Sequence, residues 1–318
     1  MIDDLKLLDD LQRKAIKKRR QCMYGDCKCD AIKSHVLQKN GILNKIAKNG
    51  HLYERQPTSW FNIFYDGVVT FKRVGLNNAY TFNGFCNNHD TAIFKPIEVE
   101  RKLDLNSNLQ QALFCYRGLC QEIRRKEIVI DIFSGNELNL NPLFYFMMNQ
   151  NSRSEREGIE NLLYFKKWLE DSILINSFDQ FYFETIQIPL IELCISVPLN
   201  IYDPDNSKSE NSRVPFVTSF INVFPKEENS YVIVGYHKDY PCNWTDSFVT
   251  QMKSRDKAIV FKALSDLLSL RLEFWLMSES LFINLSKRKI EELKEIICQN
   301  TTEFSKDLNT GFNLFADL

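Results

Sequence analysis

Four cysteines and three histidines lie in the first 90 residues, although the whole chain of 318 residues contains only nine cysteines and four histidines. A structural zinc ion takes four thiolate or imidazole ligands in a tetrahedral arrangement, and proteins often supply them as two pairs that are close in sequence. Two such pairs are present, Cys22-x4-Cys27 and Cys86-x2-His89, each beside a glycine that lets the backbone turn tightly. The sequence therefore predicts that these two segments meet around a structural zinc ion.

The ligand set has alternatives. Cys29 can replace Cys27, because the Cys-x-Cys spacing leaves the choice between the two thiols open. A group of buried free cysteines beside an incidental histidine is the alternative to any zinc site. An odd number of cysteines, in a chain whose charged first twenty residues lack the apolar core of a secretory signal, favours thiols or metal ligands over disulfides. We expect a soluble cytoplasmic protein with no membrane partner, since no window approaches eighteen apolar residues.

Another histidine follows the first pair, in the segment Ala31-Ile-Lys-Ser-His35-Val-Leu. A histidine on an apolar strand between two zinc knuckles resembles the HNH, or ββα-metal, nuclease family. In that family the pattern is Cys-x2-Cys, then Asp or Glu followed by His, then Cys-x2-Cys-His. The segments SHVLQKNGILNKIAKNGHLY and YTFNGFCNNHDTAIFKPIE also resemble a recurrent module of uncharacterised bacterial proteins. The resemblance covers about residues 20–100, which is under a third of the chain.

This resemblance implies roles for individual residues. His35 matches the general base that activates water, and Asp90 matches the terminal ligand of a catalytic metal. An imidazole can accept a proton near neutral pH, and a carboxylate suits Mg²⁺ or Mn²⁺. The structural zinc ligands implied are Cys22, Cys27 (or Cys29), Cys86 and His89.

The chain also departs from the family pattern. Ser34 stands where the family has its first acidic metal ligand, and the interval from His35 to Cys86 is longer than in the compact motif. If the catalytic site is rebuilt here, Asp30 and Glu98 are the acids that we expect near it.

Positive charge is concentrated beside the first cysteines. Residues 11–50 carry a net charge of +9, whereas residues 51–318 sum to −7. The basic run Lys17, Lys18, Arg19 and Arg20 directly precedes Cys22, and such a patch can neutralise several phosphates of DNA or RNA. A solvated helix face is the alternative. The nearby aromatic residues could stack on bases, but we interpret them as the core of a small module: Tyr53, Trp60, Phe61, Phe64 and Tyr65.

The rest of the chain combines two hydrophobic periods. Helical periodicity predicts helices over residues 3–20, 108–133, 154–172, 257–277 and 287–298. In the second of these, Arg117, Gln121, Arg124 and Arg125 fall on the polar stripe, so we expect exposed ion pairing there. Alternating and β-branched runs predict neighbouring strands over 181–188 and 191–197, and a hairpin over 216–236.

We therefore expect an α+β fold with two domains. Residues 1–105 form a zinc-binding module of treble-clef or HNH-like type. Residues 106–318 form a helical linker followed by an antiparallel sheet covered by helices.

Two functions fit these observations. The first is an HNH-like metal-dependent nuclease, such as a bacterial defence effector, with structural zinc and catalytic Mg²⁺ or Mn²⁺. The second is a non-catalytic, zinc-stabilised adaptor that binds nucleic acid or a protein partner. Ser34 favours the adaptor, whereas His35 and Asp90 favour the nuclease. In either case the C-terminal domain would sense a signal or partner. ATP-driven and hydride-transfer chemistry have no support, because the chain lacks a phosphate-binding loop and a dinucleotide fingerprint.

Overall fold

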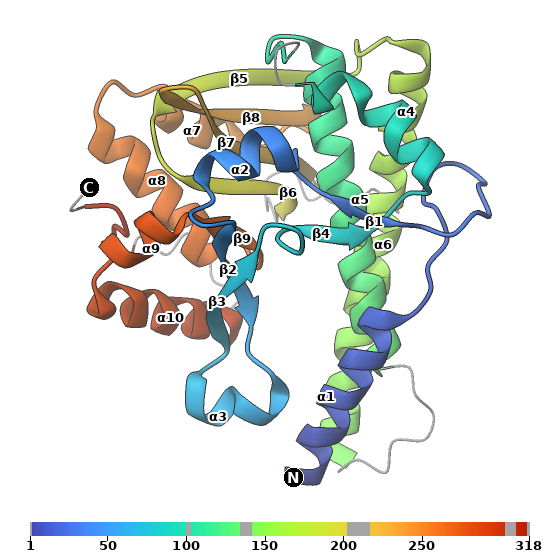
Figure 1. Ribbon diagram of the computed structural model, residues 1–318, viewed down its shortest axis with the longest axis vertical. Coiled ribbons are helices and arrows are strands. Elements are labelled where there is room, and N and C mark those ends of the chain that lie inside the picture. The colour runs from blue at the N-terminus through green and yellow to red at the C-terminus, as the bar shows by residue number, and fades with distance from the viewer. Residues whose placement is uncertain (1, 100–102, 134–141, 202–216, 303–309, 317–318) are drawn as a thin grey trace.

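The computed structural model combines helices with two antiparallel sheets, as the sequence predicts (Figure 1). It describes residues 2–99, 103–133, 142–201, 217–302 and 310–316. The helices are α1 (Ile2–Lys17), α2 (Asn44–Ile46), α3 (Ile63–Asp66), α4 (Asn87–Glu98), α5 (Asn108–Phe133), α6 (Pro142–Ile175), α7 (Asn243–Met252), α8 (Lys257–Leu270), α9 (Glu279–Asn284) and α10 (Lys287–Thr302). A π-helical turn (Lys39–Leu43) precedes α2, and a 3-10 turn (Trp60–Asn62) precedes α3.

The strands form a two-stranded and a seven-stranded sheet. The small sheet pairs β1 with β4, and the large sheet has the order β3-β2-β9-β6-β7-β8-β5. The strands are β1 (Lys33–His35), β2 (His51–Pro57), β3 (Val69–Gly75), β4 (Thr81–Asn83), β5 (Phe181–Pro189), β6 (Leu193–Ile201), β7 (Val217–Lys226), β8 (Asn229–His237) and β9 (Trp275–Met277).

Two expectations about strands were wrong. β5 and β6 are consecutive in the chain but not neighbours, because β7 and β8 lie between them and β5 pairs with β8. The helix expected over 257–277 ends at Leu270, and Trp275–Met277 forms β9 instead. The side chains of β9 are fully buried between β2 and β6, so pairing with both neighbours overrides the helical pattern.

The large sheet contains strands from both ends of the chain. Tyr53 in β2 lies opposite Met277 in β9, and Leu193 in β6 lies opposite the same methionine. Strands on both sides of residue 105 therefore share one sheet. The division into domains 1–105 and 106–318 stays a prediction.

Helix α5 occupies the centre of the molecule, beside α6 and against β6 and β7 (Figure 1). Its residues Leu113, Phe114 and Tyr116 are fully buried. On the other side α5 contacts α1, α4 and β4. This helix thus connects the large sheet to the segments that carry the cysteines.

Candidate metal centre

Cys22, Cys27, Cys86 and His89 come together at one point. Their four ligand atoms all lie within 4.8 Å of one another. The Nδ1 atom of His89 is 3.3 Å from the Sγ of Cys22 and 3.4 Å from the Sγ of Cys86. Three thiols and one imidazole at this spacing can hold a metal ion such as zinc, so the predicted ligand group is brought together.

The first pair is carried by a tight turn. The Cys27 amide donates to the Tyr24 carbonyl at 3.1 Å, and the Cys22 amide donates to the Cys29 carbonyl at 2.8 Å. Gly25, between the two cysteines, has a φ of +48°, in the left-handed region that favours glycine. This backbone path turns Cys22 and Cys27 toward the same point.

The second pair lies at the start of α4. Cys86 immediately precedes the helix, and the Asp90 amide donates to the Cys86 carbonyl at 2.9 Å, so His89 lies in the first helical turn. The Met23 amide donates to the Gly84 carbonyl at 2.8 Å and joins the two segments. Cys22 and Cys86 are nearly excluded from solvent, so the group faces the protein interior.

The thiols of this group differ in acidity. Burial raises the pKa of the Cys22 thiol to about 11, because an uncompensated thiolate is unfavourable there. The Cys29 backbone amide, by contrast, lowers the pKa of Cys27 by hydrogen bonding to its sulfur. A bound cation would favour the thiolate form of every cysteine in the group.

Cys29 is not one of the four residues whose ligand atoms all converge, although its thiol lies beside those of Cys27 and Cys86. Its side chain is exposed, and its carbonyl accepts the hydrogen bond from Cys22. Of the two thiols that the sequence left open, Cys27 is the one within reach of the other three ligands.

His35 lies on β1 with a half-buried side chain. Its Nε2 is 2.9 Å from the Leu76 carbonyl oxygen, so this nitrogen carries the proton and donates. Among the described residues Nδ1 has no partner. Burial lowers the pKa of His35, and the positive charges of Lys39 and Arg117 lower it further. The imidazole is therefore held neutral, with a lone pair on Nδ1.

Asp90 is paired with arginine. The Nη2 of Arg117 is 3.1 Å from the Asp90 carboxylate, and its Nη1 is 2.5 Å from the Glu98 carboxylate. The guanidinium also stacks over the Phe94 ring, 4.2 Å from its centroid. Within the described residues no second group of three Cys, His, Asp or Glu ligands converges. A catalytic Mg²⁺ or Mn²⁺ site therefore has no support in the geometry.

The two acids that we expected near His35 and Asp90 behave differently. Glu98 does reach this region through Arg117. Asp30 instead pairs with Arg19 at the protein surface. Ser34, in the place of the family's acid, is buried, and its hydroxyl has no partner among the described residues.

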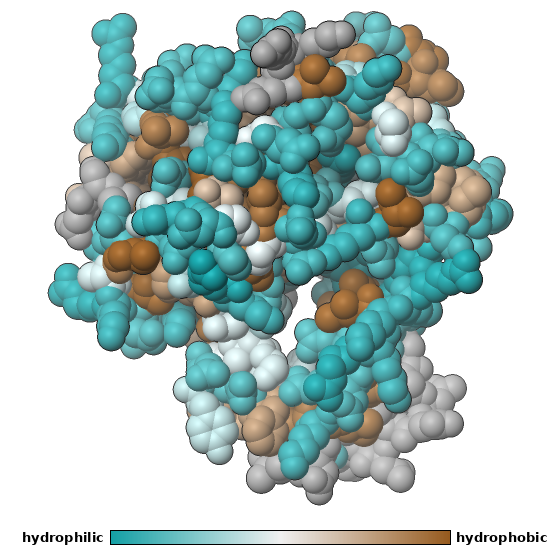
Figure 2. Space-filling view, viewed as in Figure 1, coloured by the Kyte–Doolittle hydropathy of each residue, from teal (hydrophilic) through white to brown (hydrophobic). Residues whose placement is uncertain are grey.

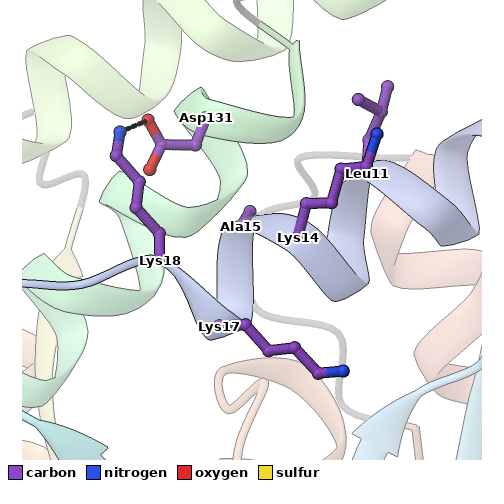
Figure 3. A pocket seen from close by; sticks show the side chains of 6 residues that line it. All are labelled: Leu11, Lys14, Ala15, Lys17, Lys18 and Asp131. Carbon is purple, nitrogen blue, oxygen red and sulfur yellow. Dashed lines mark hydrogen bonds and ion pairs between the residues drawn. The ribbon is translucent and has the colours of Figure 1, made fainter.

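Most of the basic run is engaged in ion pairs within the protein. Lys18 and Arg20 each lie 2.6 Å from the Asp131 carboxylate on α5. Figure 3 shows the Lys18 contact beside a shallow pocket between α1 and α5, which Lys17 also lines although its side chain points away from Asp131. Together with the Arg19–Asp30 pair, these contacts leave Lys17 as the run's one side chain without an acidic partner in the described part of the chain.

The aromatic residues do not form a single core. Tyr53 stacks on Phe282, and Trp60 packs against Phe133. Phe61, Phe64 and Tyr65, however, are 39%, 71% and 83% exposed. The expectation that all five are core was wrong, because the β2–β3 hairpin extends beyond the sheet and exposes its tip (Figure 1).

Sequence reasoning missed the role of the arginines on α5. Arg117 and Arg124 are 2% and 6% exposed, contrary to the expected exposed ion pairing. Arg124 donates to the carbonyls of Gln21 and Asn83 at 2.9 and 2.8 Å, and so holds the two chain segments that lead to the metal ligands. The one sequence signal was the presence of three arginines on the same helix.

Comparisons with known proteins place this chain in no family: no family model matches it, and no curated protein or solved structure is detectably similar. In the described part of the chain, none of the helices has the length and apolar character needed to span a membrane.

Proposed function

We propose that this protein is a zinc-stabilised adaptor that binds single-stranded nucleic acid without cleaving it. The exposed tip of the β2–β3 hairpin carries the proposal. Phe64 and Tyr65 are 71% and 83% exposed there. Large aromatic side chains exposed in adjacent positions are a common platform for unstacked bases.

Basic side chains lie next to this tip. The backbone amides of Trp60 and Phe61 donate to the Asp9 carboxylate at 2.8 and 3.2 Å, which fixes the tip against α1. The ammonium group of Lys6 on the same helix lies 5.7 Å from the Phe61 ring. Lys14 and Lys17 are exposed further along α1. Aromatic platforms with lysines beside them suit a strand whose bases stack while its phosphates meet positive charge.

The metal centre supports the adaptor proposal because a bound metal ion would stabilise the fold of this segment. A knuckle at residues 22–27, the β1–β4 pair and the α4 helix follow the order of a treble-clef module, and we propose that identity for residues 20–100. The absence of a second ligand group among the described residues favours binding over metal-dependent cleavage.

Fluorescence anisotropy with labelled single-stranded DNA and RNA tests the proposal on the full-length, zinc-loaded protein. The double variant Phe64→Ser, Tyr65→Ser removes two stacking surfaces, each worth about 1–3 kcal/mol per base, so we expect at least about a tenfold loss of affinity. The matched control is Leu174→Ser, Ile175→Ser, which removes two equally exposed apolar side chains at the end of α6.

We expect the α6 control to bind as tightly as the wild type and the wild type to bind more weakly as salt rises. Equal binding by the hairpin variant and the wild type would exclude the tip as the interface. No binding of either nucleic acid at low salt would exclude the function.

Nuclease activity is the second candidate, and the state of His35 favours it. A neutral imidazole with a free Nδ1 can act as a general base. His35 is on β1, which pairs with β4 just before α4, in the ββα order of the HNH family. Asp90 could bind a metal ion only after its ion pair with Arg117 is broken.

Cleavage of plasmid DNA and of RNA, with Mg²⁺ or Mn²⁺ added, tests this candidate. His35→Ala should abolish cleavage while the zinc content stays unchanged, and the control His51→Ala should cleave as the wild type does. If the wild type cleaves neither substrate with either metal, the nuclease hypothesis is rejected and the adaptor remains.

A further inference from the structure

A second recess lies apart from the metal centre, where α1, the base of the β2–β3 hairpin, β4, α5 and α6 meet. Its volume is about 530 Å³, within the range of small-molecule sites. Figure 2 shows the surface hollowed between α1 and the hairpin. Gln12 and Ile16 line it from α1, and Gln56 and Pro57 from β2. The functions proposed above do not use this recess.

Gln121 on α5 is the feature of the recess that points to a ligand. Its side chain lines the recess and is only 4% exposed, and no hydrogen bond joins its amide to another described residue, although the amide is not among the atoms that are fully buried without a partner. The amide therefore still meets the solvent of the recess, and a ligand that replaces this water can form hydrogen bonds to it in an otherwise enclosed position. A carboxamide offers one donor group and one acceptor side by side, and the edges of nucleobases carry the complementary pair.

The walls around Gln121 suit a flat ring. Phe82 on β4 and the aliphatic side chains of Ile128, Val129 and Ile132 on α5 form apolar parts of the lining. A planar heterocycle can pack against these groups while its edge bonds to Gln121.

The outer end of the recess carries a positive charge. Lys33 on β1 lines it and is exposed, and its one partner among the described residues is the neutral side-chain amide of Asn78. The other four cations of the lining are already paired: Arg20 with Asp131, Arg124 with Glu127, Arg125 with Glu122 and Glu273, and Lys126 with Glu155. Lys33 therefore provides the charge that is left for an anionic group of a ligand.

We propose that this recess binds a nucleotide, with the base against Gln121 and the phosphate at Lys33. The inference goes beyond the nucleic-acid adaptor and does not depend on it, because a protein that binds no long strand can still bind a mononucleotide. The nucleotide can be free or can be the phosphorylated end of a strand, and the experiment separates these two sources.

Isothermal titration of the full-length, zinc-loaded protein with AMP, GMP, CMP and UMP tests the proposal, with adenosine, guanosine and inorganic phosphate as partial probes. We expect at least one nucleotide to bind with micromolar affinity. Lys33→Ala should lower the affinity for that nucleotide about tenfold, equivalent to about 1.4 kcal/mol, and should leave the affinity for the matching nucleoside unchanged. Lys28→Ala, an exposed lysine outside the recess, is the matched control and should bind as the wild type does.

Gln121→Leu should lower the affinity for both nucleotide and nucleoside, because the substitution removes the amide while keeping a side chain of similar volume. If this variant fails to fold, the split between nucleotide and nucleoside in Lys33→Ala still decides the question. Displacement of the bound nucleotide by a 5′-phosphorylated oligonucleotide would identify a strand end as the ligand, and failure to displace it would identify a free nucleotide. The proposal is overturned if no nucleotide binds up to about 1 mM, or if folded Gln121→Leu binds as tightly as the wild type.

Discussion

At the scale of single residues, buried charge organises the region around the metal centre. Arg117 is 2% exposed, yet it carries two carboxylate partners and an aromatic ring within contact distance. A buried guanidinium is stable only when its charge is compensated. Arg117 therefore fixes α4, which carries Asp90 and Glu98, against α5.

Replacing Arg117 by Met should destabilise the protein. The cost of breaking a fully buried pair is about 3–5 kcal/mol, but Asp90 and Glu98 keep contact with water, so we expect about 2 kcal/mol. Urea unfolding measures the difference. In the control Arg153→Met, which breaks an exposed pair with Glu157, the loss should stay below about 0.5 kcal/mol. Equal effects of the two variants would show that Arg117 has no special structural role.

His237 makes stability depend on pH. It is 1% exposed among aromatic rings, its Nε2 has no partner among the described residues, and burial lowers its pKa. The unfolded state, with a pKa near 6.5, then binds more protons than the folded state. The stability contributed by the neutral imidazole is present above about pH 6.5 and is lost as the pH falls through the folded-state pKa. His35, whose pKa is also lowered by burial, acts in the same direction.

We therefore expect His237→Phe to lose less stability than the wild type between about pH 7 and pH 5, as measured by thermal unfolding. The phenyl ring keeps the aromatic packing and cannot titrate. An unchanged pH dependence in this variant would mean that His237 is not a source of it.

At the scale of elements, the approach of α5 to β6 depends on a glycine. A Cβ atom at Gly118 would lie 2.5 Å from the Ser196 hydroxyl and 3.0 Å from the Ser196 backbone. That backbone is held in place, because the Tyr80 hydroxyl bonds to both the Ser196 carbonyl and its amide, at 3.0 and 2.6 Å. No side chain fits at this position unless the helix moves away from the sheet.

Gly118→Ala should therefore destabilise the protein by about 1–3 kcal/mol, as overpacking does. Gly158→Ala on α6 is the matched control. There the nearest atom is the flexible end of Lys126, at 3.2 Å, so we expect a gain of about 0.5–1 kcal/mol from helix propensity. The midpoints of chemical unfolding compare the two variants. A stabilised Gly118→Ala protein would contradict the close contact between α5 and β6.

At the scale of the whole molecule, the metal centre and the large sheet are physically connected. Arg124 on α5 holds the segments beside the metal ligands, and β2 of the N-terminal part pairs with β9 near the C-terminus. A substitution that disrupts the metal centre should therefore also destabilise the large sheet.

Cys86→Ser tests this connection. We expect the wild type to contain one zinc per chain and the variant to lose it, since a hydroxyl is a poor substitute for a thiolate. Unfolding of the variant should remain a single transition at lower denaturant, with coincident curves from tryptophan fluorescence and circular dichroism. Two separate transitions would show that the zinc module is an independent domain, and retention of full zinc would show that the ligand group is wrong.

The metal centre could be predicted from the sequence because it depends on local chemistry. The short spacings Cys22-x4-Cys27 and Cys86-x2-His89 let a local backbone turn bring the two ligands of each pair together. Thiolate and imidazole ligands in turn favour zinc. Helices such as α5 were also predictable, because their periodicity repeats every few residues. The HNH-like identity stays a prediction.

The tertiary structure alone decided the features that depend on distant contacts. The pairing of Arg55 with Trp275 joins residues far apart in the chain, and no local pattern distinguishes such a strand from the end of a helix. Burial of Arg117 likewise depends on acids supplied by another helix. The surroundings of the Gln121 amide depend on several other elements that enclose the recess, among them α1, β2, β4 and α6. The physical reason is the same in each case. The free energy of a side chain depends on what the completed fold places around it, whereas a local motif depends only on its neighbours in sequence.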